Sequence, residues 1–127
     1  MDIRQISGYS FSFIGDAVFT LRVREFFIQK GYQSSGTLQK LCNAYNSAKG
    51  QTRVFERLNA KDFFTEEERD AYRRGRNHIN HIPKNGDLQT YECASGLEAI
   101  CGYLYLTDRE RLDVFFEEVF KGGIYNE

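Results

Sequence analysis

The clearest hydrophobic pattern of the chain lies in its last quarter and predicts an α-helix over residues 108–121. Apolar side chains recur there at spacings of three and four residues, which places them on one helical face. These side chains are Leu112, Phe115, Phe116, Val119 and Phe120. A T-x-x-E capping box of Thr107 and Glu110 is expected to begin the helix, and Gly122 and Gly123 are expected to end it.

Three further helices are predicted between residues 38 and 76. A second capping box, Thr65 with Glu68, begins a helix over residues 66–76, and three acidic residues in its first turn complement the helix dipole. Residues 38–44 and 48–58 are expected to form two shorter helices joined by a turn.

The segment 11–30 fits two patterns. Phe19, Leu21 and Val23 alternate with polar residues as they would in a strand. The segment is long for a strand, however, and Gly31 is a good helix terminator, so we favour a helix. The apolar face of that helix is expected to contain Ile14, Ala17, Val18, Leu21 and Ile28.

Residues 87–106 predict one more helix, with Asp87 at its N-cap and an acidic side chain on its buried side. The apolar stripe consists of Ala94, Leu97, Cys101, Leu104 and Tyr105. Glu98 falls on this stripe, and Asp16 lies among apolar residues in the same way. A carboxylate in apolar surroundings is costly unless it is paired, protonated or bound to a cation. Both acids are therefore expected to have partners.

Two arrangements satisfy this expectation. Asp16 and Glu98 can converge on one hard divalent cation, for which carboxylate oxygens are the natural ligands, and phosphodiester hydrolysis is then available. Alternatively, each acid forms a structural ion pair with an arginine such as Arg22 or Arg53. Spacing alone favours the ion pairs.

The composition limits the class of protein. The single proline, Pro83, favours long helices and an all-α fold, and 127 residues fit one domain over 1–127. No apolar run reaches the roughly 20 residues of a membrane span, and no signal peptide is expected. The three cysteines show no C-x-x-C pairing, so a reducing cytoplasm is expected. Because the net charge is -1, any contact with nucleic acid requires a local basic patch.

Residues 73–86 form such a patch, since the segment contains four fixed positive charges and no acid. A basic, polar loop suits contact with the phosphates and 2′-hydroxyls of double-stranded RNA. The alternative is a solvated loop with several arginines, and the residues alone favour that alternative. The candidate RNA-binding residues are Arg73, Arg74, Arg76, Asn77, His78, Lys84 and Asn85. His78 and His81 alone are poor evidence for a metal site.

Two motifs then identify a resemblance. The sequences F-I-G-D-A-V at 13–18 and L-E-A-I-C-G-Y-L at 97–104 resemble the two motifs of the ribonuclease III catalytic domain. More specifically, the chain resembles Mini-ribonuclease III, the short form without a separate domain that binds double-stranded RNA. Supporting blocks follow in the family's order at residues 47–49, 64–68, 73–77 and 83–91.

The resemblance implies a helical fold like the ribonuclease III catalytic domain, in a homodimer whose two sites cut opposite strands of double-stranded RNA. Asp16 and Glu98 would bind Mg²⁺, or alternatively Mn²⁺. Phe13 would lie at the dimer interface, and the basic loop would contact RNA. The implied substrate is precursor large-subunit (23S) ribosomal RNA, cut to 5′-phosphate and 3′-hydroxyl ends, with a ribosomal protein as a candidate partner.

The chain departs from the broader family at three positions where acids are expected. Tyr9, Ser12 and Ser95 occupy them, so we hypothesise that water and the RNA phosphate supply part of the magnesium coordination. The missing acids also leave open a noncatalytic RNA-binding or ribosome-assembly module on the same fold. A purely structural helical dimer is a third alternative.

Overall fold

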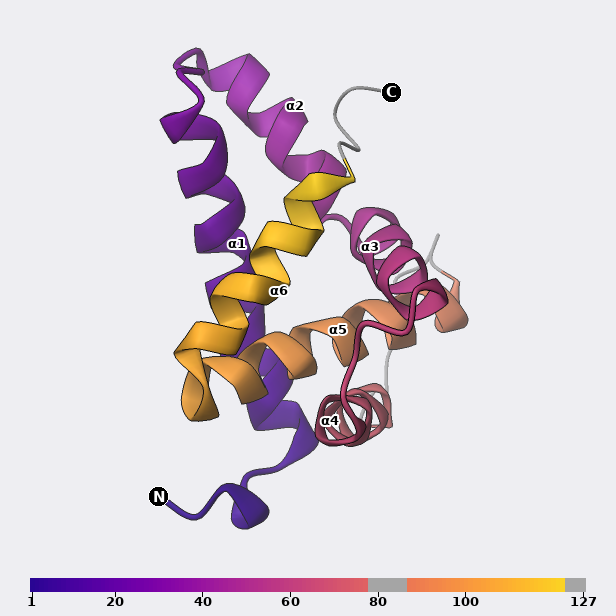
Figure 1. Ribbon diagram of the computed structural model, residues 1–127. Helices are drawn as coiled ribbons and strands as arrows, with labels where there is room; N and C mark the ends of the chain where they lie inside the picture. Colours follow the sequence, from indigo (N-terminus) through magenta and orange to yellow (C-terminus); the bar gives the residue numbers. More distant parts are fainter. Residues whose placement is uncertain (78–86, 123–127) are drawn as a thin grey trace.

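The computed structural model describes residues 1–77 and 87–122, and this part of the chain is helical without strands (Figure 1). The predicted all-α class is thus confirmed. The elements are η1 (Ile3–Gln5), α1 (Gly8–Gln29), α2 (Ser35–Asn46), α3 (Ala48–Ala60), α4 (Glu66–Arg76), α5 (Leu88–Thr107) and α6 (Arg109–Lys121). Within the same residues, no helix combines the length and the hydropathy that a membrane span needs.

Most of the helix caps predicted from the local sequence are present in the structure. Thr65 and Glu68 form the predicted capping box of α4, with bonds of 3.2 Å and 2.9 Å between each side chain and the other residue's backbone N–H. Asp87 caps α5 as expected. The box predicted at Thr107 is wrong, because α5 extends through that residue and Asp108 caps α6 instead. The Thr107 hydroxyl donates to the Tyr103 carbonyl at 2.6 Å.

Helix α5 is the centre of the molecule and is buried on more than one side. Helices α1, α3, α4 and α6 all pack against it, with α1 crossing it in Figure 1. The predicted stripe on α5 was therefore too narrow. Every residue from Cys93 to Leu97 and from Ala99 to Gly102 is buried.

The strand alternative for the first segment is wrong, and the apolar face predicted for the helix is correct only at Val18, which is buried, and Ile14, which is partly buried. Leu21 and Ile28 are 58% and 60% exposed, and Ala17 is also exposed. The buried side of α1 contains Phe11, Val18, Phe19, Val23 and Phe27. Apolar residues occupy both sides of α1, so periodicity alone does not identify the side that faces α5.

Glycines decide which side of α1 meets α5. A Cβ at Gly15 would overlap the Glu98 carbonyl oxygen, and a Cβ at Gly102 would overlap the Phe11 carbonyl oxygen. The backbones of α1 and α5 can cross this closely only because both glycines lack a side chain. The crossing places Asp16, the residue after Gly15, beside α5.

We expect Gly15→Ala to destabilise the protein by about 1–3 kcal/mol, because the added methyl group forces the two backbones apart. Urea unfolding followed by circular dichroism measures this change. Gly36→Ala in α2 is the matched control, since a Cβ there meets nothing within 4 Å and alanine is the better helix former. Equal stability of the two variants would show that the crossing tolerates a side chain.

Candidate active site

The helix crossing brings the two predicted acids together. Asp16 from α1 and Glu98 from α5 line one open cavity of about 360 Å³. The remaining residues of the cavity wall are Tyr9, Ser12, Phe13, Asn46, Ala48, Gln51, Tyr91, Ala94 and Ser95. The surroundings of the two acids differ, because Glu98 is partly buried whereas Asp16 is exposed. The expectation of apolar surroundings is thus correct for Glu98 and wrong for Asp16.

The two carboxyl groups interact directly. The pKa of Glu98 is raised to about 8 by burial, by a hydrogen bond with Asp16 and by the negative charge of that residue. A hydrogen bond from the Gln51 amide acts in the opposite direction. Two carboxylates that share a site repel each other when both are ionised. The pair is therefore electrostatically unsatisfied without a proton or a cation between its members.

The donor set fits a hard divalent cation. Carboxylate oxygens are the ligands that Mg²⁺ and Mn²⁺ prefer, and Mg²⁺ commonly keeps several waters beside one or two carboxylates. In the described ranges, no cluster of three or more histidine, cysteine or acidic side chains could hold a metal ion. Asp16 and Glu98 are the acidic side chains of the cavity wall, so a cation bound in this cavity would be held by them and would compete with the Glu98 proton.

The raised pKa of Glu98 predicts a loss of stability with increasing pH in metal-free protein. Glu98 binds a proton in the folded state up to about pH 8, whereas an unperturbed glutamate loses its proton near 4.5. The folded state therefore binds more protons within this window, and the free energy of unfolding decreases as the pH rises through it. The expected loss is a few kcal/mol at most, since one pKa unit corresponds to about 1.4 kcal/mol.

Urea unfolding between pH 5 and pH 9 in the presence of a chelator tests this prediction. Glu98→Gln cannot titrate at this position, so its stability should depend less on pH than that of the wild type. Identical pH profiles for the two proteins would contradict the raised pKa of Glu98.

The serines at two of the expected acid positions connect three helices. Ser12 and Ser95 are both 5% exposed. The Ser12 hydroxyl donates to the Ser95 carbonyl at 2.8 Å, and the Ser95 hydroxyl lies 3.1 Å from the carbonyl of Gly75 in α4. A Cβ at Gly75 would overlap the side chain of Ala99. These small residues thus hold the end of α4 against α1 and α5, close to the candidate site.

The third expected acid position is occupied by an aromatic side chain. Tyr9 is 57% exposed and stacks on Phe13, with ring centroids 5.8 Å apart. Phe13, the predicted dimer-interface residue, is 69% exposed. Both rings also lie in the wall of the cavity that contains Asp16 and Glu98.

The predicted RNA-binding arginines lie near the end of α4 but differ in their contacts. Arg73 is exposed, with a guanidinium nitrogen 3.7 Å from a carboxylate oxygen of Glu66. Arg74 donates to the Ile6 carbonyl and lies over the Phe11 ring, 5.2 Å from its centroid. Arg74 thus connects α4 to the residues before α1, whereas Arg73 reaches solvent.

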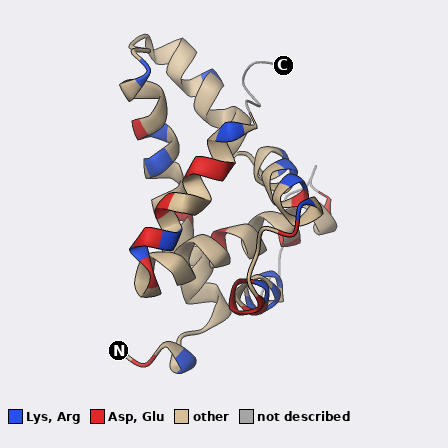
Figure 2. Cartoon of the chain, viewed as in Figure 1, with Lys and Arg blue, Asp and Glu red and all other residues tan. Residues whose placement is uncertain are grey.

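Arg76 lies over the Tyr72 ring, with its nearest guanidinium nitrogen 3.8 Å from a carboxylate oxygen of Glu92. Asn77 is exposed and forms the C-cap of α4. Figure 2 shows both charge signs on α4. The other predicted RNA contacts, His78, Lys84 and Asn85, lie outside the described residues.

The arginine alternative for the buried acids can be examined at Arg22. Its guanidinium pairs with Asp113 of α6 at 2.5 Å and lies over the Phe116 ring. Glu98 instead contacts Asp16 and Gln51. The observed contacts thus favour the shared-site arrangement over a pair with Arg22.

Sequence reasoning did not identify Gln51, whose side chain reaches Glu98. Gln51 could have been found because it is a polar residue on the apolar face of α3, at helical spacing from Val54 and Leu58. The same argument that singled out Glu98 on α5 would have found it.

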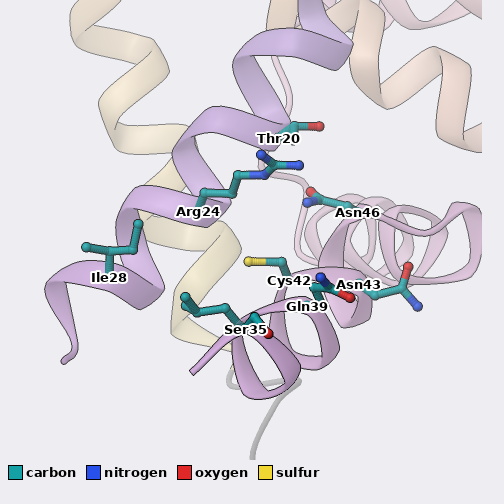
Figure 3. A pocket seen from close by; sticks show the side chains of 9 residues that line it. Thr20, Arg24, Ile28, Ser35, Gln39, Cys42, Asn43 and Asn46 are labelled. Atoms are coloured by element: carbon teal, nitrogen blue, oxygen red, sulfur yellow. The ribbon is translucent and has the colours of Figure 1, made fainter. Parts of the chain in front are cut away.

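A second cavity, of about 630 Å³, lies between α1 and α2. Figure 3 shows Arg24 and Thr20 from α1 and three amide side chains from α2 in its wall. These amides are Gln39, Asn43 and Asn46. Asn46 also lines the cavity of Asp16 and Glu98. The two hollows are therefore neighbours, and the wall of the larger one combines these polar side chains with the apolar Ile28, Leu38 and Cys42.

Comparisons with known proteins agree with this geometry. The family model of the ribonuclease III domain matches residues 10–109. A Mini-ribonuclease 3 of Enterococcus faecalis is 36% identical over 114 residues, which cover 88% of this chain and 86% of the relative. A Mini-ribonuclease 3 of Streptococcus pneumoniae is 37% identical over 115 residues, with coverages of 89% and 90%.

A solved structure gives the same result for the fold. The crystal structure of a protein from Fusobacterium nucleatum is 31% identical in sequence and superposes with a TM-score of 0.83. The match covers 95% of this chain and 98% of that chain. The predicted ribonuclease III-like helical arrangement thus extends over nearly the whole chain.

Proposed function

The chain belongs to the ribonuclease III family, and on that premise we propose that Asp16 and Glu98 form the catalytic centre with which it cleaves double-stranded RNA. The family assignment makes the protein an endoribonuclease, and double-stranded RNA is the substrate class of the family. The observation that carries the proposal is the shared cavity, since two acids far apart in the chain meet there.

We propose Mg²⁺, with Mn²⁺ as a substitute, as the ion that the two acids hold. Such an ion supplies an activated water and stabilises negative charge on the phosphate oxygens. Asp16 and Glu98 contribute its protein ligands. The burial of Glu98 strengthens its electrostatic interactions, because they are less screened by water than those of an exposed side chain. Cleavage is expected to leave 5′-phosphate and 3′-hydroxyl ends.

Basic and amide side chains on two surfaces of the protein suggest where the RNA backbone would lie. Arg73 and Asn77 at the end of α4 are exposed, and the groove between α1 and α2 adds the guanidinium of Arg24 beside the amide of Asn46. Side chains of these kinds bind phosphate and 2′-hydroxyl groups. We therefore expect the scissile strand to pass over the mouth of the cavity between these two surfaces.

Helix α1 supports a homodimer as the active form. Tyr9 and Phe13 stack on each other and are each more than half exposed, so association over this pair would bury apolar area. With Phe13 at the interface, two copies of the site would cut opposite strands of one duplex. Sedimentation equilibrium of the purified chain tests this association, and a monomeric mass would contradict it.

We further propose that residues 1–127 act as a single catalytic domain in the cytoplasm. Precursor 23S ribosomal RNA is the proposed substrate, and a ribosomal protein that shapes this RNA is a proposed partner. Incubation with this precursor, with and without ribosomal proteins, tests both proposals. Cleavage of unrelated duplexes with equal efficiency would contradict the ribosomal substrate.

A cleavage assay separates the enzyme from a noncatalytic RNA-binding module. The purified protein is incubated with end-labelled duplex RNA and either magnesium or chelator, and the products are resolved on a denaturing gel. Shortened strands with magnesium alone are expected. Salt-sensitive duplex binding without cleavage would instead support the noncatalytic module.

The small number of acids predicts that metal binding depends on the substrate. With two protein carboxylates, magnesium should bind weakly to the free protein and more tightly when an RNA phosphate adds a ligand. Isothermal titration with and without a noncleavable duplex measures both affinities. Tight binding to the free protein would contradict a role for the phosphate.

A further inference from the structure

Gln51 occupies an unusual place for a polar side chain. It lies in the first turn of α3 and is only 3% exposed. Burial of an amide is unfavourable unless its polar atoms find partners. The side chain does find one, because the Gln51 Nε2 atom donates to a carboxylate oxygen of Glu98 at 3.2 Å.

The backbone around Gln51 is firmly held. The Ser47 side chain caps α3 by accepting from the Gly50 N–H at 3.0 Å. A Cβ at Gly50 would overlap the Ala44 carbonyl oxygen, so the start of α3 lies directly against α2. Because this junction fixes the backbone at Gln51, the amide approaches Glu98 from a defined direction.

We propose that Gln51 is a positioning residue that orients the Glu98 carboxylate toward Asp16 across the active-site cavity. This inference rests on the proposed function, in which both acids hold a divalent cation. The bond occupies one oxygen of Glu98 and restricts its rotation. Hydrogen bonds of this kind behind a metal ligand commonly change metal affinity or activity by about 10–100-fold.

A purely structural role is less consistent with the neighbouring contacts. The next residue, Thr52, already connects α3 to α5 through a hydrogen bond to the Thr90 carbonyl at 3.1 Å. The amide of Gln51 ends on a carboxylate in the cavity and not on backbone. Thr52 therefore provides a matched control, a hydrogen bond between the same two helices that does not reach Glu98.

The test replaces Gln51 with methionine, which has a similar length and no donor. The complex of full-length protein with a noncleavable duplex is titrated with Mn²⁺, and electron paramagnetic resonance reports the free ion. We expect Gln51→Met to weaken Mn²⁺ binding by about 10–100-fold and to lower kcat by a similar factor. The affinity for the duplex measured in the presence of a chelator should stay unchanged.

Two further variants keep the result interpretable. Thr52→Val should lower the melting temperature without changing Mn²⁺ binding. Gln51→Asn, which keeps an amide too short to reach Glu98, should reproduce the loss of Mn²⁺ affinity and serves if Gln51→Met does not fold.

Wild-type Mn²⁺ binding in a folded Gln51 variant would overturn the proposal, as would a loss of Mn²⁺ affinity in Thr52→Val equal to that in Gln51→Met. The proposed function fails separately, if the wild-type protein does not cleave duplex RNA in the presence of a divalent cation.

Discussion

Glu98→Gln is expected to lower the rate of duplex RNA cleavage by roughly three orders of magnitude or more. The amide keeps the shape of the side chain but removes the charge that holds a divalent cation. Metal ions contribute several kcal/mol to the stabilisation of such transition states, and each ~1.4 kcal/mol corresponds to a tenfold change in rate. Single-turnover cleavage of end-labelled duplex RNA measures the effect.

The fold of Glu98→Gln should resemble that of the wild type, because the glutamine retains the size of the side chain. Its duplex affinity should do so when measured with a chelator, where no metal ion couples the protein to the RNA. Glu92→Gln is the matched control, an acid of the same helix that lies near Arg76 and outside the cavity. Cleavage by Glu98→Gln at the rate of this control would remove Glu98 from the catalytic centre.

Arg111→Met is expected to destabilise the protein by about 3–5 kcal/mol, because it leaves a buried carboxylate without its partner. Glu68 is 2% exposed and accepts two hydrogen bonds from the Arg111 guanidinium, at 2.8 Å and 2.9 Å. The same guanidinium donates to the Phe63 carbonyl at 2.8 Å. The pair joins α4 to α6. Thermal and urea unfolding measure the loss.

A more exposed ion pair provides the comparison. Arg22 pairs with Asp113, whose side chain is 63% exposed, so the expected change for Arg22→Met is at most about 1 kcal/mol. The double variant Glu68→Leu with Arg111→Met should recover much of the stability that Arg111→Met loses. Equal losses for Arg22→Met and Arg111→Met would contradict the importance of burial.

The caps of the helices and the all-α class could be predicted because they depend on residues that are near one another in the sequence. The box of Thr65 and Glu68 and the cap at Asp87 require only the local sequence, and both are present. The local sequence indicated only that Glu68 belongs to a helix cap, and not that it forms an ion pair. Its partner Arg111 lies far along the chain, so the ion pair that joins α4 to α6 was not visible from spacing.

The buried side of α1 could not be predicted because apolar residues lie on both of its sides. Leu21 belongs to both predicted patterns and is 58% exposed, whereas Phe19 belongs to the strand pattern alone and is fully buried in the helix. The close approach at Gly15 and Gly102 decides between the two sides. Such an approach depends on the pairing of two distant segments, which a single-helix pattern does not contain.

The two acids of the candidate site could be predicted from the sequence, but the contacts of the residues around them could not. Glu98 was identified because a carboxylate on an apolar stripe needs a partner, and Asp16 is now seen beside it. Arg74 was assigned to RNA on the charge of its segment and on the family resemblance, whereas its guanidinium donates to the Ile6 carbonyl. Charge in a sequence indicates a capacity to bind, and the packing of α4 determines which arginine is available for it.

The most direct test of the account is the position of a bound ion. A crystal soaked with Mn²⁺ and measured for anomalous scattering should show one peak between the carboxylates of Asp16 and Glu98. Strong peaks elsewhere, with no density between these two side chains, would contradict a metal-dependent catalytic centre at the crossing of α1 and α5.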